Sequence, residues 1–106
     1  MTDTRFAVSL QAEKSSSVLT VNEPLMETKL AEEFEAACQK LVDTGQENMA
    51  IDVRRVESIQ SCLIGEVAKT KVIATEAGHR FQLIANQKMH DLFRMILGDL
   101  VDIKVE

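Results

Sequence analysis

The sequence predicts an α/β fold in which a mixed, mostly parallel sheet packs with helices. Segments with the two-residue period of a strand alternate with segments of helical period, and such alternation implies parallel strands joined by right-handed crossovers. The first two strand-like segments follow each other directly, which predicts an antiparallel hairpin. The expected order is β-β-α-β-α-β-α-β, and 106 residues suit one domain, residues 1–106.

The first half of the chain is expected to contain the hairpin, one helix and a central strand. Residues 5–10 and residues 17–22 have the strand pattern, and Pro24 then breaks the chain because it lacks a backbone N–H. Residues 27–43 have helical spacing, and Gly45 follows where a left-handed residue often ends a helix. The apolar stripe of this helix consists of Leu30, Phe34, Ala37, Cys38, Leu41 and Val42. The short apolar run 49–53 predicts a strand buried on both faces.

The second half is expected to contain two more helices and two more strands. Residues 61–77 predict a helix followed by Gly78, and residues 80–85 predict a strand. Asn86 is a natural N-cap for a helix over residues 87–97, and residues 101–105 predict the last strand. One side of the first of these helices is expected to carry Ile64, Val67, Ala68, Lys71, Val72 and Thr75. The apolar face of the second is expected to carry Met89, Leu92, Phe93 and Ile96.

Composition argues against nucleic-acid and membrane partners. The net charge of −5 disfavours phosphate backbones and anionic lipids, and the lack of Trp and Tyr removes stacking platforms. No run of about 18 apolar residues is present to span a membrane. Residues 1–5 lack the features of a secretory signal, so a cytoplasmic location with reduced Cys38 and Cys62 is expected.

The familiar signatures of catalysis are missing from the sequence. No GxxxxGK[ST], GxGxxG or GxSxG pattern occurs. His79 and His90 stand alone and are interpreted as solvated, since a zinc site needs three or four convergent ligands. Neighbouring carboxylates such as Glu32 and Glu33 are interpreted as a solvated face. We therefore expect no catalytic residues, no cofactor and no metal.

The most informative segment is residues 54–65, between the central strand and the second helix. The loop after the carboxyl end of a parallel strand is a common place for partners to meet an α/β protein. Ser61 falls near the start of the helix, and its structural interpretation is an N-cap contributing about 1 kcal/mol. Its functional interpretation is a phosphorylation site, because the positive end of a helix dipole accommodates a phosphate.

This segment resembles the STAS family, the anti-sigma factor antagonists and their relatives. The family pattern is an apolar strand ending in Asp, a few residues, and then Asp-Ser-Ser-Gly-Leu-Gly opening a helix. Residues 49–53, with Asp52, match the strand, and residues 59–65 match the helix opening in register. The resemblance covers most of the chain and implies a STAS-like layer fold with the element order given above.

The resemblance also implies a function and a site. In such families the first serine of the motif is phosphorylated by a partner kinase that doubles as an anti-sigma factor, which places the phosphoacceptor at Ser61. The chain departs from the pattern at Gln60, Cys62 and Leu63, which replace Asp, Ser and Gly, and in the turn at residues 22–25. The residues expected to face a partner are Asn22, Glu23, Asp52, Gln60, Ser61, Cys62 and Leu63.

Several alternatives accompany this interpretation. Thiols near helix starts can be redox-active, but packing is the preferred interpretation of Cys62, and Cys38 is assigned to the core.

The departures from the motif favour a second function, a non-phosphorylated STAS adaptor subunit of a signalling complex or ABC transporter. An enzyme or small-ligand binder ranks below both. A dimer through an edge strand or an apolar helix face is compatible with the pattern.

Overall fold

The computed structural model of the protein describes residues 5–106, so most of the segment from which we inferred the lack of a secretory signal lies outside the described residues. A five-stranded sheet with the order β1-β2-β4-β6-β7 forms its frame. The first pair is antiparallel and the other three pairs are parallel, which confirms the predicted mixed sheet. The strands are β1 (Phe6–Gln11), β2 (Ser16–Val21), β4 (Asn48–Asp52), β6 (Arg80–Ala85) and β7 (Ile103–Val105).

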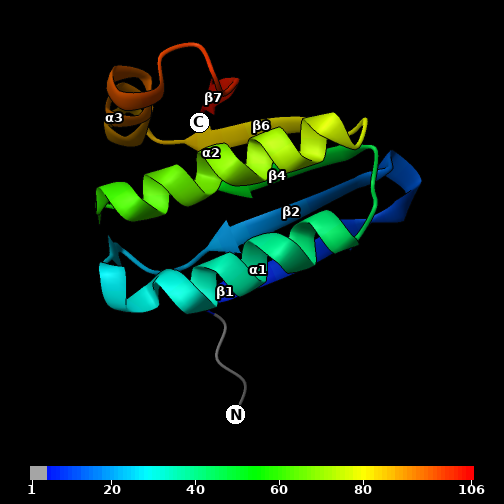
Figure 1. Ribbon diagram of the computed structural model, residues 1–106, viewed down its shortest axis with the longest axis horizontal. Coiled ribbons are helices and arrows are strands. Elements are labelled where there is room, and N and C mark those ends of the chain that lie inside the picture. The colour runs from blue at the N-terminus through cyan, green and yellow to red at the C-terminus, as the bar shows by residue number, and fades with distance from the viewer. Residues whose placement is uncertain (1–4) are drawn as a thin grey trace.

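Three helices join the parallel strands: α1 (Ala31–Asp43), α2 (Ser61–Glu76) and α3 (Gln87–Leu97). The strands follow one another across the sheet in chain order, so right-handed crossovers bring the helices to the same face. Figure 1 shows α1 and α2 side by side in front of the sheet, with α3 at one end of it. The predicted α/β architecture, a mostly parallel sheet packed with helices, is confirmed.

The opposite face of the sheet is not covered by a helix. Along β4, Met49 and Ile51 are 2% and 0% exposed and point to the helices. Asn48 and Ala50 alternate with them and are only half-buried. The prediction that this strand is buried on both faces is therefore wrong. A run of apolar residues reflects two covered faces only when crossovers place helices on both sides.

Helix α2 turns a different face to the core from the predicted one. Its buried residues are Leu63, Ile64, Val67, Thr70 and Ala74. Of the predicted face only Ile64 and Val67 are buried, and Val72 is 38% exposed. The buried residues follow the regular helical spacing of three and four, but the stripe begins one position earlier, at Leu63, and continues through Thr70 instead of Lys71. The hydroxyl of Thr70 donates to the carbonyl of Glu66 at 2.8 Å, which allows it to be buried.

The other two helices match their predictions more closely. The core side of α1 consists of Phe34, Cys38 and Leu41, as expected. The helix begins at Ala31 rather than at residue 27, because residues 28–30 form a 3₁₀ turn, η2 (Thr28–Leu30). A further 3₁₀ turn, η1 (Ala12–Lys14), connects β1 to β2.

Helix α3 has both of its predicted boundaries. The Oδ1 of Asn86 accepts the N–H of Met89 at 2.8 Å, which confirms the predicted N-cap. Met89 and Phe93 are buried as expected, whereas Ile96 is 47% exposed. The last strand is shorter than predicted, because Val101 is buried in the preceding loop and pairing begins only at Ile103.

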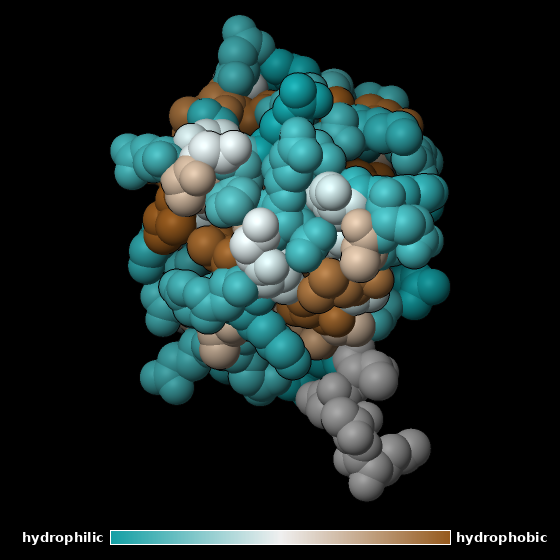
Figure 2. Space-filling model, turned by 90° about the vertical axis from the view of Figure 1, so that its right-hand side faces the viewer, coloured by the Kyte–Doolittle hydropathy of each residue, from teal (hydrophilic) through white to brown (hydrophobic). Residues whose placement is uncertain are grey.

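The two ends of the sheet differ in their connections. The parallel strands begin at the right-hand side of Figure 1, and Figure 2 views that end, where hydrophilic side chains cover most of the surface. The strands end at the opposite side, where the loops leading into α1 and α2 lie. Within residues 5–106, no helix has the length and apolar character needed to cross a membrane.

Candidate functional site

Two loops meet at the carboxyl ends of β2 and β4 and are joined by a short ladder that the sequence did not predict. The ladder consists of β3 (Leu25–Met26) and β5 (Ser58–Ile59), which pair in parallel. The carbonyl of Pro24 accepts the N–H groups of residues 57 and 58 at 2.8 and 3.1 Å. The N–H of Gln60 donates to the carbonyl of Met26 at 2.9 Å. The entry to α1 and the entry to α2 therefore form one continuous surface.

A side-chain contact continues this ladder. The Oε1 of Gln60 accepts a hydrogen bond from the Oγ1 of Thr28 at 2.6 Å and a second one from the backbone N–H of Thr28. Gln60 is the N-cap residue of α2, with φ −80° and ψ 150°, but its side chain makes no capping bond to that helix. Its amide oxygen instead accepts hydrogen bonds from Thr28, the first residue of the 3₁₀ turn η2 that leads into α1.

Ser61 is the first residue of α2, one position after the N-cap. The interpretation of Ser61 as the N-cap is therefore wrong, because the backbone of Gln60 is extended and occupies that position. The side chain of Ser61 is exposed, and its hydroxyl makes no hydrogen bond with any of residues 5–106. The serine hydroxyl is available at the surface where the two loops meet.

The two cysteines have opposite environments. Cys38 is 1% exposed, which confirms its assignment to the core. Burial raises the pKa of its thiol to about 12, against the effect of a hydrogen bond with Thr70, so the thiol stays protonated and inert at neutral pH. Cys62 is exposed and free, with its Sγ 3.5 Å from the Oγ1 of Thr28. The expectation that Cys62 serves packing is wrong, because the core face of α2 begins at the next residue.

Leu63 and Gly65 lie on opposite sides of the same helical turn. Leu63 is 0% exposed and belongs to the core, so the expected exposure of its side chain to a partner is wrong. Gly65 is exposed, one turn after Ser61, and a Cβ placed on it would have no atom within 4 Å. Neither a neighbouring side chain nor a positive φ requires glycine at this position.

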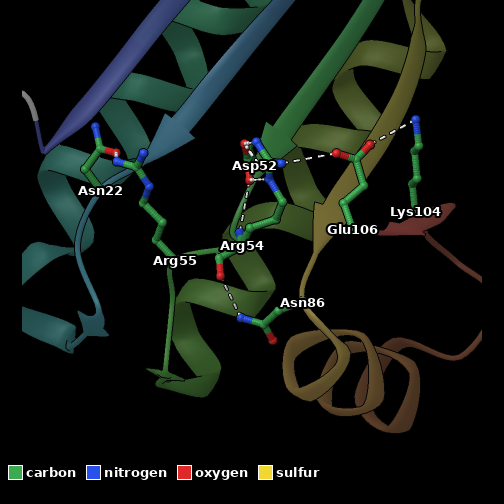
Figure 3. A network of polar contacts seen from close by, with 7 residues as sticks. All are labelled: Asn22, Asp52, Arg54, Arg55, Asn86, Lys104 and Glu106. Atoms are coloured by element: carbon green, nitrogen blue, oxygen red, sulfur yellow. Dashed lines mark hydrogen bonds and ion pairs between the residues drawn. The ribbon is translucent and has the colours of Figure 1, made fainter.

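A polar network lies next to this surface, and Figure 3 shows it at the ends of β4 and β7. Asp52 is 7% exposed and accepts hydrogen bonds from Arg54, at 3.0 Å from its N–H and 2.8 Å from its Nη2. Arg54 reaches Glu106 at 3.1 Å, and Glu106 pairs with Lys104 at 2.9 Å. The carbonyl of Arg54 accepts the Nδ2 of Asn86 at 2.8 Å, so the loop after β4 is fixed to the start of α3.

Asn22 and Glu23 lie at the start of the loop after β2. The Oδ1 of Asn22 accepts the Nη1 of Arg55 at 2.7 Å, which connects the two loops near their bases (Figure 3). Glu23 pairs with the Nε of Arg5 at 2.9 Å, and Arg5 also binds Glu33 on α1 at 2.8 Å. Both predicted residues are half-buried and contribute to the scaffold of the site.

The structure brings Gln60, Ser61 and Cys62 together at the surface, and it places Asp52 in the adjacent polar network and Leu63 in the core. Sequence reasoning missed the roles of Thr28, Arg54 and Leu25, the last of which belongs to the ladder and is 50% exposed. Arg54, two residues after Asp52, is the sequence signal for the ion pair. No sequence signal pointed to Thr28, because its partner Gln60 is 32 residues away.

The Asp52–Arg54 pair makes stability depend on pH. Burial acts to raise the pKa of Asp52, but the hydrogen bonds and the charge of Arg54 outweigh it and lower the pKa below its usual 3.8. The stabilisation is fully present above that usual value and is lost as pH falls through the lowered pKa.

We therefore expect the Asp52→Asn variant to lose about 1 kcal/mol of stability at pH 7, since Arg54 is partly exposed and the pair is screened. The difference in the free energy of unfolding between this variant and the wild type should shrink as the pH falls from 4 to 2. Urea unfolding at these pH values measures it, with Glu57→Gln, an exposed acid of the same loop, as the control. A difference that stays constant over this range would contradict the assignment.

No arrangement for metal chemistry accompanies the site. Among residues 5–106, no group of three His, Cys, Asp or Glu side chains is placed to hold a metal ion. His90 lies on the surface of α3, where its Nδ1 is 3.0 Å from Asp91 Oδ1 and 3.4 Å from Gln87 Nε2. The available chemistry at the loop surface is that of an exposed hydroxyl and an exposed thiol.

Comparison with solved structures identifies the fold. The chain is similar to an anti-sigma factor antagonist from Mycobacterium paratuberculosis, with a TM-score of 0.78 and 18% identity over 92% of this chain and 82% of the other. It is similar to the protein TM1081, with a TM-score of 0.76 and 19% identity over 94% and 80% of the two chains. It is also similar to the Bacillus cell fate determinant SpoIIAA in its phosphorylated form, with a TM-score of 0.68 and 15% identity over 95% and 92%.

These likenesses show that the chain has the fold of the anti-sigma factor antagonists, the STAS fold, and they confirm the predicted resemblance at the level of structure. No protein-family model and no curated protein matches the sequence. The identities of 15–19% are low enough that the site must be argued from this chain's own residues.

Proposed function

We propose that this protein is a regulatory protein-binding module that acts as an anti-sigma factor antagonist. In this proposal it binds a partner kinase that doubles as an anti-sigma factor, and phosphorylation of Ser61 switches the association. The observation that carries the proposal is the exposed Ser61 hydroxyl, at the first residue of α2 and at the surface where two loops meet. The proposal takes residues 1–106 as one cytoplasmic domain without a catalytic residue or cofactor.

The start of α2 suits a phosphorylated side chain. The N–H groups at the first positions of a helix have no partners within the helix, and the first one paired in α2 is that of Leu63, which donates to the carbonyl of Gln60 at 3.0 Å. A phosphate on Ser61 would lie near these free donors and at the positive end of the helix dipole. The helix would therefore tolerate the modification without unfolding.

The same phosphate would change the character of the surface. The neighbours of Ser61 in the chain, Gln60 and Cys62, are uncharged, and so is Thr28, which contacts both. A phosphoserine adds a charge of about −1.5 to −2 at neutral pH. A partner that packs against the uncharged surface would then face a charge that it has to desolvate.

We expect one phosphate to be transferred to Ser61. The purified chain is incubated with ATP and a histidine-kinase-like ATPase encoded beside it, and intact-mass spectrometry should show the mass of a single phosphate. The Ser61→Ala variant should lose this addition and Ser58→Ala should retain it, since Ser58 is an exposed serine of the same surface. Addition to Ser61→Ala, or no addition with any such kinase, would contradict the switch.

A second candidate is an adaptor that docks the same surface without phosphorylation, as a subunit of a signalling complex or ABC transporter. The observation that favours it is the position of Gln60, which lies where the resembled motif has an acid and whose side chain turns toward Thr28. A pull-down that recovers a transporter ATPase or a scaffold protein equally well with Ser61→Ala would support the adaptor over the switch.

A further inference from the structure

The side chain of Gln60 bonds to the opposite loop. Its Oε1 accepts both donors of Thr28, the backbone N–H and the Oγ1 hydroxyl, the latter at 2.6 Å. No other hydrogen bond of the Gln60 side chain occurs within residues 5–106. This pair of bonds, here called the Gln60–Thr28 contact, directly follows the last residue pair of the β3–β5 ladder.

The contact satisfies a donor that would otherwise lack a protein partner. Thr28 begins the 3₁₀ turn that leads into α1, and the first N–H groups of a helical segment have no acceptor within it. Leu30, two residues later, donates to the carbonyl of Glu27, but among residues 5–106 the N–H of Thr28 has Gln60 as its one acceptor. The N-cap residue of α2 therefore caps the entry to α1.

The length of the side chain matters for this bond. The backbone of Gln60 is held in place, because its N–H donates to the carbonyl of Met26 at 2.9 Å. An aspartate at this position, as in the resembled motif, has one methylene fewer. With the backbone fixed, its carboxylate would fall short of Thr28, whereas a glutamate would reach it.

We propose that Gln60 is a positioning residue. It holds the entry to α1 against the entry to α2 through Thr28, so that Leu25, Ser61 and Cys62 form one ordered surface. In this role Gln60 bonds to its own chain and not to a partner. Only the description of the surface as partner-facing rests on the proposed function; the contact itself belongs to the free protein.

The test is amide hydrogen exchange and chemical shift by NMR on the full free chain. In Gln60→Ala and Gln60→Asp the amide of Thr28 should exchange about five- to tenfold faster, as expected for the loss of one net hydrogen bond, and its proton should shift upfield. Gln60→Glu should restore both the exchange rate and the shift. The amide of Leu83, which donates to Asp102 in the sheet, should not change in any variant.

The outcomes separate the role of Gln60 from general destabilisation and from the proposed function. Faster exchange at both Thr28 and Leu83 in Gln60→Asp, or an unchanged Thr28 amide in Gln60→Ala, would overturn the proposal. Thr28→Val, which keeps the N–H and removes the hydroxyl, should preserve part of the protection. All these measurements use the free protein, so they stand whether or not Ser61 is ever phosphorylated.

Discussion

The Leu63→Gly variant should lose about 3–6 kcal/mol of its free energy of unfolding, because a buried leucine side chain leaves a cavity and glycine weakens the helix. Leu63 is 0% exposed and lies among the apolar side chains of the core. The total free energy of unfolding of a native domain is about 5–15 kcal/mol, so the variant should be close to unfolding at 37 °C. Urea denaturation followed by circular dichroism measures the change.

The matched control is Gly65→Ala, two residues further along the same helix. Gly65 is exposed and an added Cβ meets no atom within 4 Å, so alanine should stabilise the protein by about 0.5–1 kcal/mol through helix propensity. A cost below about 1 kcal/mol for Leu63→Gly would contradict the role of Leu63 in the core. A destabilising Gly65→Ala would show that the first turn of α2 is not the regular helix described.

These two positions show why restoring the resembled motif in this chain is not a neutral change. The motif has glycine where Leu63 lies, and the sequence alone suggested an altered partner surface. The structure instead assigns Leu63 to packing, together with Ile64 and Val67. The side chain that replaces the motif glycine is therefore buried in the core, and Ser61 and Cys62 remain exposed beside it.

Much of the fold could be predicted because its elements carry local signals. Strand β6 and helix α3 have their predicted boundaries, since Asn86 caps the helix and Gly98 follows it. The hairpin and the parallel crossovers follow from the order of the segments. The ladder of β3 and β5 could not be predicted, because two-residue strands have no periodicity and exist only through pairing between distant loops.

The site could be located in the sequence but its orientation could not. A helix advances about 100° per residue, so a shift of one position in the apolar stripe changes the face that is assigned to the core. The sequence interpretation assigned Cys62 to packing and Leu63 to the partner-facing surface, whereas Cys62 is exposed and Leu63 is buried. The cap is Gln60 because the β3–β5 ladder ends there, a tertiary cause that no local pattern records.

Under the proposed function, phosphorylation of Ser61 should weaken binding of the partner kinase by about 2–4 kcal/mol, or about 30- to 1,000-fold. Gln60 and Cys62, which flank Ser61 in the chain, and Thr28, which contacts both, carry no formal charge, so a partner complementary to them offers no cation to the phosphate. An unpaired charge that is desolvated in an interface is costly. Titration calorimetry with the phosphorylated and unphosphorylated chains measures the difference.

The Ser61→Asp variant should reproduce part of this loss with a single charge. Its control is Ser9→Asp, which adds the same charge to an exposed serine of β1, at the edge of the sheet. Equal losses in the two variants would mean that net charge and not position weakens the complex. Tighter binding after phosphorylation would mean that the partner reads the phosphate directly, through cations complementary to the start of α2, and the direction of the proposed switch would be reversed.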